Sequence, residues 1–77
     1  MFTLYTTRGC RNCQYAKLCL DDHGVRATVT QVDDKQRRDA LKDIYGAKAF
    51  PIILKGADYI GGFSELVDYL NGQDQHQ

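Results

Sequence analysis

Short runs of β-branched and aromatic residues predict the strands of this chain. The second run alternates, and the third contains the chain's single Pro, which is tolerated only at a strand start because it cannot donate a ladder hydrogen bond. Between the third and fourth runs stands Gly56-Ala57, which is typical of a two-residue type II′ hairpin turn. The pattern predicts four strands, at residues 2–6, 26–32, 50–54 and 58–60.

Apolar residues at helical spacing occupy the intervals between these strands. They predict a first helix over residues 11–22, with Gly24 where a helix would stop. Asp33 is placed to cap a second helix, and Gln36 stands three residues further on, as in a capping box. We expect this second helix to run to about Tyr45 and to end at the following Gly.

The last element is a short helix that Ser64 is placed to cap, followed by a polar tail at residues 73–77 that should fray. The resulting order is β-α-β-α-β-β-α. A right-handed crossover makes the first two strands parallel, and the hairpin adds antiparallel strands. We therefore predict one α/β domain over residues 1–77, with a four-stranded mixed sheet packed between helices.

Composition and charge exclude several classes of function. The chain has 77 residues, of which 43% are apolar and 26% charged, so it should form one small ordered domain with its active site at the surface. Ten Lys and Arg balance ten Asp and Glu, which leaves no summed positive field for a nucleic acid. The chain has neither a membrane-spanning apolar run nor the pattern of a signal peptide. We expect a cytoplasmic monomer with no membrane partner.

The candidate chemistry lies in Cys10-Arg11-Asn12-Cys13, which follows the first strand and opens the first helix. Free N–H groups and the helix macrodipole stabilise an anion there, so Cys10 should be largely thiolate near neutral pH, helped by Arg8 and Arg11. Cys13 lies one turn further on, close enough for a disulfide but more buried. Cys10 would then attack a substrate disulfide, and Cys13 would resolve the mixed disulfide.

Two other interpretations of the cysteines stay open. The Cys-x-x-Cys pair could be half of a zinc site that Cys19 and His23 complete, although Cys19 lies about 9 Å of helix rise beyond Cys13. The pair could also be a coincidence of spacing. We favour the redox dithiol, with Cys19 as a core thiol and His23 as a solvated residue near the helix end.

The order of elements and several motifs resemble the glutaredoxin family of the thioredoxin-like fold, over nearly the whole chain. The shared motifs are a strand ending in Tyr-Thr before Cys-x-x-Cys, a single Pro opening the third strand, and Ile-Gly-Gly after the hairpin. The resemblance implies a cis peptide before Pro51, with the backbone of Phe50 facing Cys10 and pairing with the cysteinyl main chain of glutathione. It also implies that the turn at residues 62–64 receives the γ-glutamyl carboxylate, which suits the free N–H groups of a helix start.

The chain departs from the usual glutaredoxin pattern at the redox motif, where Arg11-Asn12 stands in place of Pro-Tyr. The family's basic residue for the glycyl carboxylate aligns near Ala47, so Lys48 or Arg37 must substitute. The expected catalytic residues are Cys10 and Cys13, and those expected to bind glutathione or substrate are Arg8, Arg11, Arg37, Lys48, Phe50, Pro51, Gly62, Phe63 and Ser64.

The resemblance implies a dithiol–disulfide oxidoreductase with glutathione as reductant, no tightly bound cofactor and no metal. Its substrates would be protein disulfides or glutathione mixed disulfides, with ribonucleotide reductase as one candidate. The chain also resembles the small redoxin dedicated to ribonucleotide reductase, which thioredoxin reductase reduces. A non-catalytic metal or iron–sulfur module is the alternative from another class. The sequence leaves the reductant open.

Overall fold

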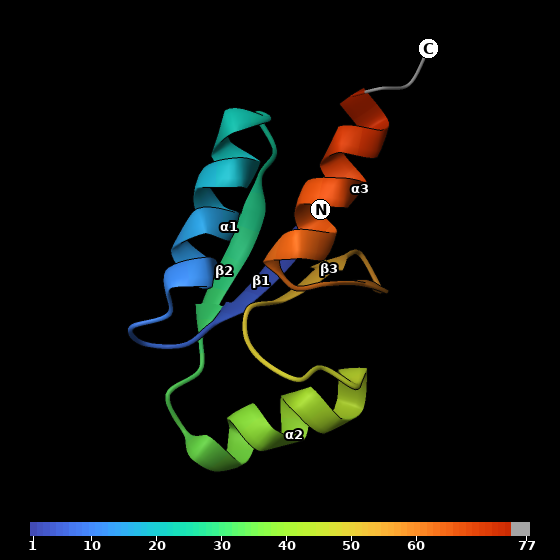
Figure 1. Ribbon diagram of the computed structural model, residues 1–77. Helices are drawn as coiled ribbons and strands as arrows, with labels where there is room; N and C mark the ends of the chain where they lie inside the picture. Colours follow the sequence, from blue (N-terminus) through green and yellow to red (C-terminus); the bar gives the residue numbers. More distant parts are fainter. Residues whose placement is uncertain (75–77) are drawn as a thin grey trace.

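The computed structural model describes residues 1–74 of the chain, and their elements follow the predicted order β-α-β-α-β-β-α (Figure 1). This confirms the predicted fold class. The elements are β1 Phe2–Thr6, α1 Arg11–Asp22, β2 Ala27–Gln31, α2 Lys35–Tyr45, β3 Ile52–Lys55, β4 Asp58–Gly61 and α3 Phe63–Asp74. Residues 73 and 74, which were expected in a fraying tail, are the last two residues of α3, and the rest of that tail lies outside the described residues.

The strands form one mixed sheet in the order β2-β1-β3-β4. β1 pairs in parallel with β2 and antiparallel with β3, so Leu4 has Val29 on one side and Ile53 on the other. β3 and β4 form the expected hairpin, and Gly56 has the positive φ, 60°, that the first position of such a tight turn requires. The parallel pair of β1 and β2 and the antiparallel pair of β3 and β4 are both as the sequence predicts.

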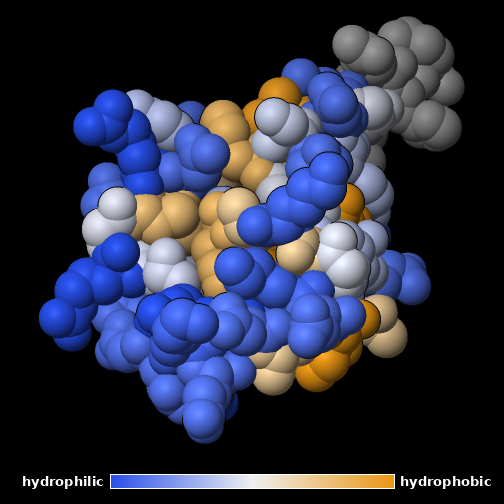
Figure 2. Space-filling model, turned by 60° about the horizontal axis from the view of Figure 1, so that its bottom comes forward, coloured by the Kyte–Doolittle hydropathy of each residue, from blue (hydrophilic) through white to orange (hydrophobic). Residues whose placement is uncertain are grey.

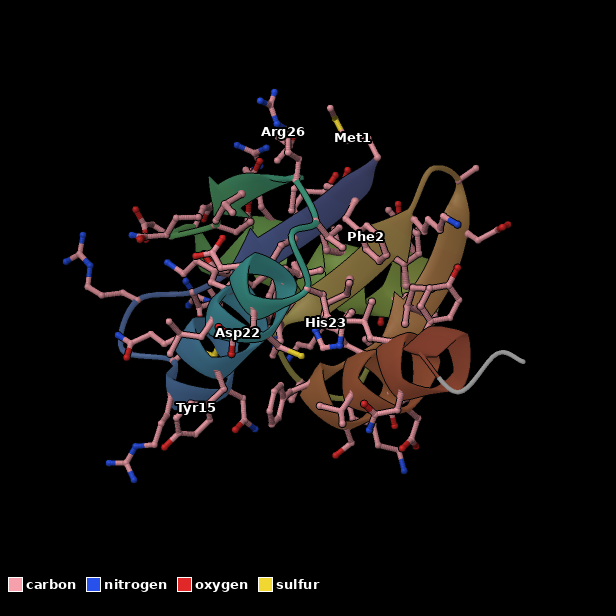
Figure 3. The ribbon with its side chains drawn as sticks, turned by 90° about the horizontal axis from the view of Figure 1, so that it is seen from above. Met1, Phe2, Tyr15, Asp22, His23 and Arg26 are labelled. Atoms are coloured by element: carbon pink, nitrogen blue, oxygen red, sulfur yellow. A yellow bond between two sulfur atoms is a disulfide. The ribbon has the colours of Figure 1, made fainter. Side chains whose placement is uncertain are left out.

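The core lies between the sheet and the two helices α1 and α3, which cover the same face (Figures 1 and 3). Every second side chain of β1 points toward these helices. The helices pack against them with buried residues that lie three or four positions apart. The buried members of this cluster are Phe2, Leu4, Ala16, Leu20, Ile53, Leu66 and Leu70. The start of α1 and the start of α3 are thereby held side by side at one end of the sheet (Figure 1).

The helix α2 is attached differently, because none of its residues is buried. It lies beyond the end of the sheet at which α1 and α3 begin (Figure 1). Its last residue, Tyr45, stacks on Tyr59 of β4 with ring centroids 5.6 Å apart. Tyr59 pairs with Leu54 and so lies on the sheet face opposite the α1–α3 cluster. The side chain of Ile44 points into solvent and is 69% exposed.

Two helix caps differ from the prediction by one or two residues. Asp34, not Asp33, caps α2, and its carboxylate accepts a hydrogen bond from the N–H of Gln36 at 3.3 Å. The carboxylate of Asp33 instead accepts a hydrogen bond from the side-chain amide of Gln31 at 2.8 Å, and this contact lies outside the helix. Capping depends on local backbone angles, and two adjacent Asp residues offer the same side chain to the helix.

The helix α3 begins at Phe63, so Ser64 lies inside its first turn and is not its cap. The first helical hydrogen bond runs from the N–H of Leu66 to the carbonyl of Gly62, which makes Gly62 the capping residue. A smaller difference concerns Phe50 and Pro51, which precede β3 instead of opening it. Pro has no N–H to give to a ladder, which fits this position outside the strand. No helix within residues 1–74 is long and apolar enough to cross a bilayer.

Candidate active site

The site is built around Cys10 and Cys13, which form a disulfide at the start of α1 with Cα atoms 5.2 Å apart. Cys10 is the N-cap of the helix and its side chain is half-buried. Cys13 faces the core and is only 2% exposed. A substrate can therefore reach the sulfur of Cys10 and not that of Cys13, which supports the division of roles predicted for the two thiols.

The start of α1 favours negative charge on the sulfur of Cys10. The N–H of Cys13 donates to this sulfur at 3.1 Å, and it is one of the N–H groups that a helix leaves unpaired in its first turn. The macrodipole adds to the effect, and α1 has no acidic residue in its first turn to oppose it. Arg11 is the first residue of the helix and is exposed.

The loop between α2 and β3 forms the other side of the site. The Phe50–Pro51 peptide is cis, as the resemblance implies, and Pro51 is buried. The carbonyl oxygen of Phe50 lies 3.8 Å from the sulfur of Cys10. Main-chain atoms beside the reactive sulfur are available to a peptide group bound there.

The start of α3 completes the site and contains a residue that the sequence reasoning missed. The carboxylate of Glu65 accepts a hydrogen bond from the N–H of Gly62 at 2.8 Å. A Cβ atom on Gly61 would lie 2.6 Å from Cγ and 2.7 Å from Cβ of Glu65, so this position requires glycine. The signal was present in the sequence, because Glu65 stands three residues after Gly62, which is the spacing of a capping box.

Glu65 also changes the electrostatics of its neighbour Tyr59. Partial burial raises the pKa of the Tyr59 phenol above its usual value, and the negative charge of Glu65 raises it further. Tyr59 is therefore neutral at physiological pH. The site combines a carboxylate, an aromatic wall and the free N–H groups of a helix start.

A groove of about 530 Å³ runs beside the disulfide, between the α2–β3 loop, β4 and the start of α3. It brings together six of the predicted binding residues, which are Lys48, Phe50, Pro51, Gly62, Phe63 and Ser64. With this end of the molecule turned forward, hydrophobic residues gather near the middle of the face and hydrophilic ones surround them (Figure 2). The lining of the groove includes the apolar residues Ala47, Phe50 and Phe63 and the charged residues Lys48 and Glu65.

The other predicted binding residues lie outside the groove. Arg8 lies 4.0 Å from the carboxylate of Asp33, and both line a separate hollow with Thr7 and Arg38. Arg38, and not the neighbouring Arg37, reaches back to the backbone carbonyl of Asp33. Arg37 is exposed on α2 and does not line the groove. Of the two basic candidates for the glycyl carboxylate, Lys48 is the one that the fold brings to the groove.

The third cysteine belongs to the core side of α1. Cys19 is not part of the disulfide; it is half-buried and packs against the main cluster. His23 was expected to be solvated, yet it is half-buried, and its Nδ1 lies 2.9 Å from the carbonyl oxygen of Cys19 (Figure 3). His23 is the C-cap of α1, and its backbone N–H also donates to the Cys19 carbonyl at 3.2 Å, so the fold of the helix end brings the ring close to the same oxygen. Within the described part of the chain, no three His, Cys, Asp or Glu residues are grouped as metal ligands.

A Cys-x-x-Cys disulfide at a helix start, opposite a cis-Pro loop, on this order of elements defines a redox protein of the thioredoxin-like class. Within that class the chain belongs to the glutaredoxin family, whose family model matches residues 2–60. Membership implies thiol–disulfide oxidoreductase activity.

Solved structures share this fold. Glutaredoxin 1 from Francisella tularensis, complexed with cacodylate, is similar with a TM-score of 0.83 and 25% identity, over 97% of this chain and 96% of that one. A buckwheat glutaredoxin–glutathione complex has a TM-score of 0.81 and 21% identity, over 94% and 69%. The glutaredoxin-like NrdH-redoxin from Escherichia coli has a TM-score of 0.73 and 22% identity, over 99% and 95%. A search of curated proteins gave no match.

Proposed function

We propose that the protein is a glutathione-dependent oxidoreductase that reduces protein disulfides and glutathione mixed disulfides. The observation that carries the proposal is the accessible sulfur of Cys10, which receives the N–H of Cys13 at 3.1 Å and stands beside the groove. In the reduced protein, the Cys10 thiolate attacks one sulfur of the substrate disulfide and releases the other as a thiol. Cys13 then attacks the mixed disulfide, so that the substrate leaves fully reduced and the Cys10–Cys13 disulfide forms.

Two glutathione molecules return the protein to its dithiol form and become glutathione disulfide, which balances the electrons. For the first of them, the groove offers a complementary group for each end of the tripeptide. The unpaired N–H groups of Phe63 and Ser64 suit the γ-glutamyl carboxylate, and the carboxylate of Glu65 suits its ammonium group. Lys48 suits the glycyl carboxylate, and the Phe50 main chain suits the cysteinyl backbone.

The decisive experiment reduces the oxidised protein with glutathione, glutathione reductase and NADPH, and in parallel with thioredoxin reductase and NADPH. NADPH consumption with hydroxyethyl disulfide in the first system supports the proposal, and turnover in the second system alone refutes glutathione dependence. Lys48→Ala should raise the KM for glutathione and leave kcat nearly unchanged, because it removes binding that is equal in ground and transition states. Arg37→Ala, outside the groove, is the matched control.

Cys10→Ser should abolish reduction of every disulfide, because no mixed disulfide can form without its thiolate. Cys19→Ala should leave the activity nearly unchanged, since Cys19 packs on the core side of α1. The cytoplasmic location belongs to the same proposal, because the cytosol keeps thiols reduced. Ribonucleotide reductase as the protein substrate stays a prediction from the sequence resemblance.

A further inference from the structure

The outer face of α1 breaks three local rules of helix design within one row of residues. Tyr15 and Leu18 are apolar yet 46% and 59% exposed. Arg11 opens the helix, whose first turn has no acidic residue, and Asp22 closes it, in a last turn with no basic residue. Both charges oppose the macrodipole, which destabilises the helix at each end. Places where a sequence departs from local rules are commonly functional.

These four residues lie on one side of the helix. Positions 11, 15, 18 and 22 are three or four residues apart, so they form a row along the surface that faces away from the core. Figure 3 shows Tyr15 directed away from the sheet. Within the described part of the chain, Phe63 contacts the ring of Tyr15 and leaves it 46% exposed, while Leu18 is 59% exposed. Cys13, Ala16 and Leu20 on the opposite side of α1 are its buried residues.

The row is continuous with the redox groove. The ring of Tyr15 packs against the ring of Phe63 with centroids 5.7 Å apart, and Phe63 lines the groove. Arg11 immediately follows Cys10, so the row starts at the reactive sulfur. A polypeptide joined to Cys10 through its cysteine can therefore leave the groove over Phe63 and Tyr15 and continue along α1.

We infer that this row, Arg11-Tyr15-Leu18-Asp22, is a docking surface for the polypeptide disulfide substrates of the protein; the inference rests on the proposed oxidoreductase function. The order of charges selects the occupant. Complementarity requires an acidic residue near the substrate cysteine, an apolar residue further away and a basic residue at the far end. The row is about 16 Å long, because Arg11 and Asp22 are eleven helical rises apart. An extended peptide of about five residues spans the same length.

The test uses single turnover of the reduced protein with peptides joined to mercaptoethanol through one cysteine. The first peptide has acidic, apolar and basic residues in that order outward from the cysteine on both sides, and the second has the acidic and basic residues exchanged. Each reaction releases the peptide thiol and mercaptoethanol and leaves the Cys10–Cys13 disulfide. Hydroxyethyl disulfide is the substrate without a segment to dock.

We expect the first peptide to react with a half-saturating concentration about tenfold lower than the second, a preference that falls as salt is added. Leu18→Glu should remove most of the advantage by placing a charge in the apolar part of the row, and Asp22→Lys should favour a peptide without the basic residue. The matched control Ile44→Glu places a charge on an apolar position of α2 that is 69% exposed, compared with 59% for Leu18, and should change nothing. All three variants should reduce hydroxyethyl disulfide at the wild-type rate.

Equal reaction of the two peptides, or an unchanged preference in Leu18→Glu, overturns the docking surface while the oxidoreductase function stands. Failure of the wild type to reduce hydroxyethyl disulfide overturns the function itself. A third outcome assigns the face to a second copy of the chain. In that case the wild type sediments as a dimer, Leu18→Glu as a monomer, and the peptides do not differ.

Discussion

Replacement of Gly61 by Ala tests how tightly the start of α3 is built. Gly61 has φ 133°, and its Cβ would come within 2.7 Å of both Cβ and Cγ of Glu65. These atoms are the base of the Glu65 side chain, which cannot move away without shifting the first turn of the helix. Backbone strain contributes about 1–3 kcal/mol and overpacking a similar amount, so we expect a loss of about 3–4 kcal/mol in the free energy of unfolding.

Gly56→Ala is the matched control, because Gly56 also has a positive φ, 60°, but no atom lies within 4 Å of its Cβ position. It should lose only about 1–2 kcal/mol, the penalty of a left-handed L-residue. At about 4–8 °C per kcal/mol for a domain of this size, the two variants should differ in Tm by about 10 °C. Urea unfolding followed by circular dichroism measures the free energy of unfolding of the two variants, and thermal unfolding measures their Tm values.

A double variant separates the two contributions. In a Glu65→Gly background the clashing atoms are absent, so adding Gly61→Ala should lose little more than Gly56→Ala loses in the wild type. If Gly61→Ala and Gly56→Ala unfold at the same urea concentration, the contact with Glu65 does not exclude a side chain at position 61. The capping account of Glu65 would then be wrong as well.

Three further predictions concern catalysis, capping and pH. Cys13→Ser should keep the reduction of glutathione mixed disulfides and lose that of protein disulfides, and equal loss in both assays contradicts the assigned roles. Asp34→Ala should lower the free energy of unfolding by about 1 kcal/mol and Asp33→Ala by less than half of that, as urea titration can show. Glu65→Gln should lower the pKa of Tyr59, which ultraviolet titration of the phenol measures. Because folding raises that pKa, the associated stability is full below pH 10.0 and is lost as the pH rises through the folded value.

Patterns that depend on neighbouring residues in the chain made most of the fold predictable. The Cys10–Cys13 spacing after a strand indicated the redox pair, and the structure places the two sulfurs in a disulfide at the helix start. The Gly56-Ala57 turn gave the hairpin, and the crossover rule gave the parallel pair of β1 and β2. Each of these features follows from local sequence or from general rules of chain connection.

Features that depend on small local shifts or on tertiary contacts were not predictable. The choice between Asp33 and Asp34 as a cap depends on backbone angles at a single residue. Arg37 and Lys48 were equivalent as basic candidates until the fold placed only Lys48 at the groove. Glu65 was missed although it stands at capping-box spacing from Gly62, because a glycine at the first position lacks the side chain that usually marks such a box.

The shallow attachment of α2 has a consequence for motion. A helix without buried residues loses little apolar contact when it opens, so α2 should open locally while the sheet and its α1–α3 cluster stay folded. Its amide protons should exchange with solvent much faster than those of β1. The loop that follows α2 contains Lys48 and Phe50, and the Tyr45–Tyr59 stack is what links this segment to β4. We therefore expect one wall of the groove to be adjustable, which would let a single redox centre accept disulfides of different bulk.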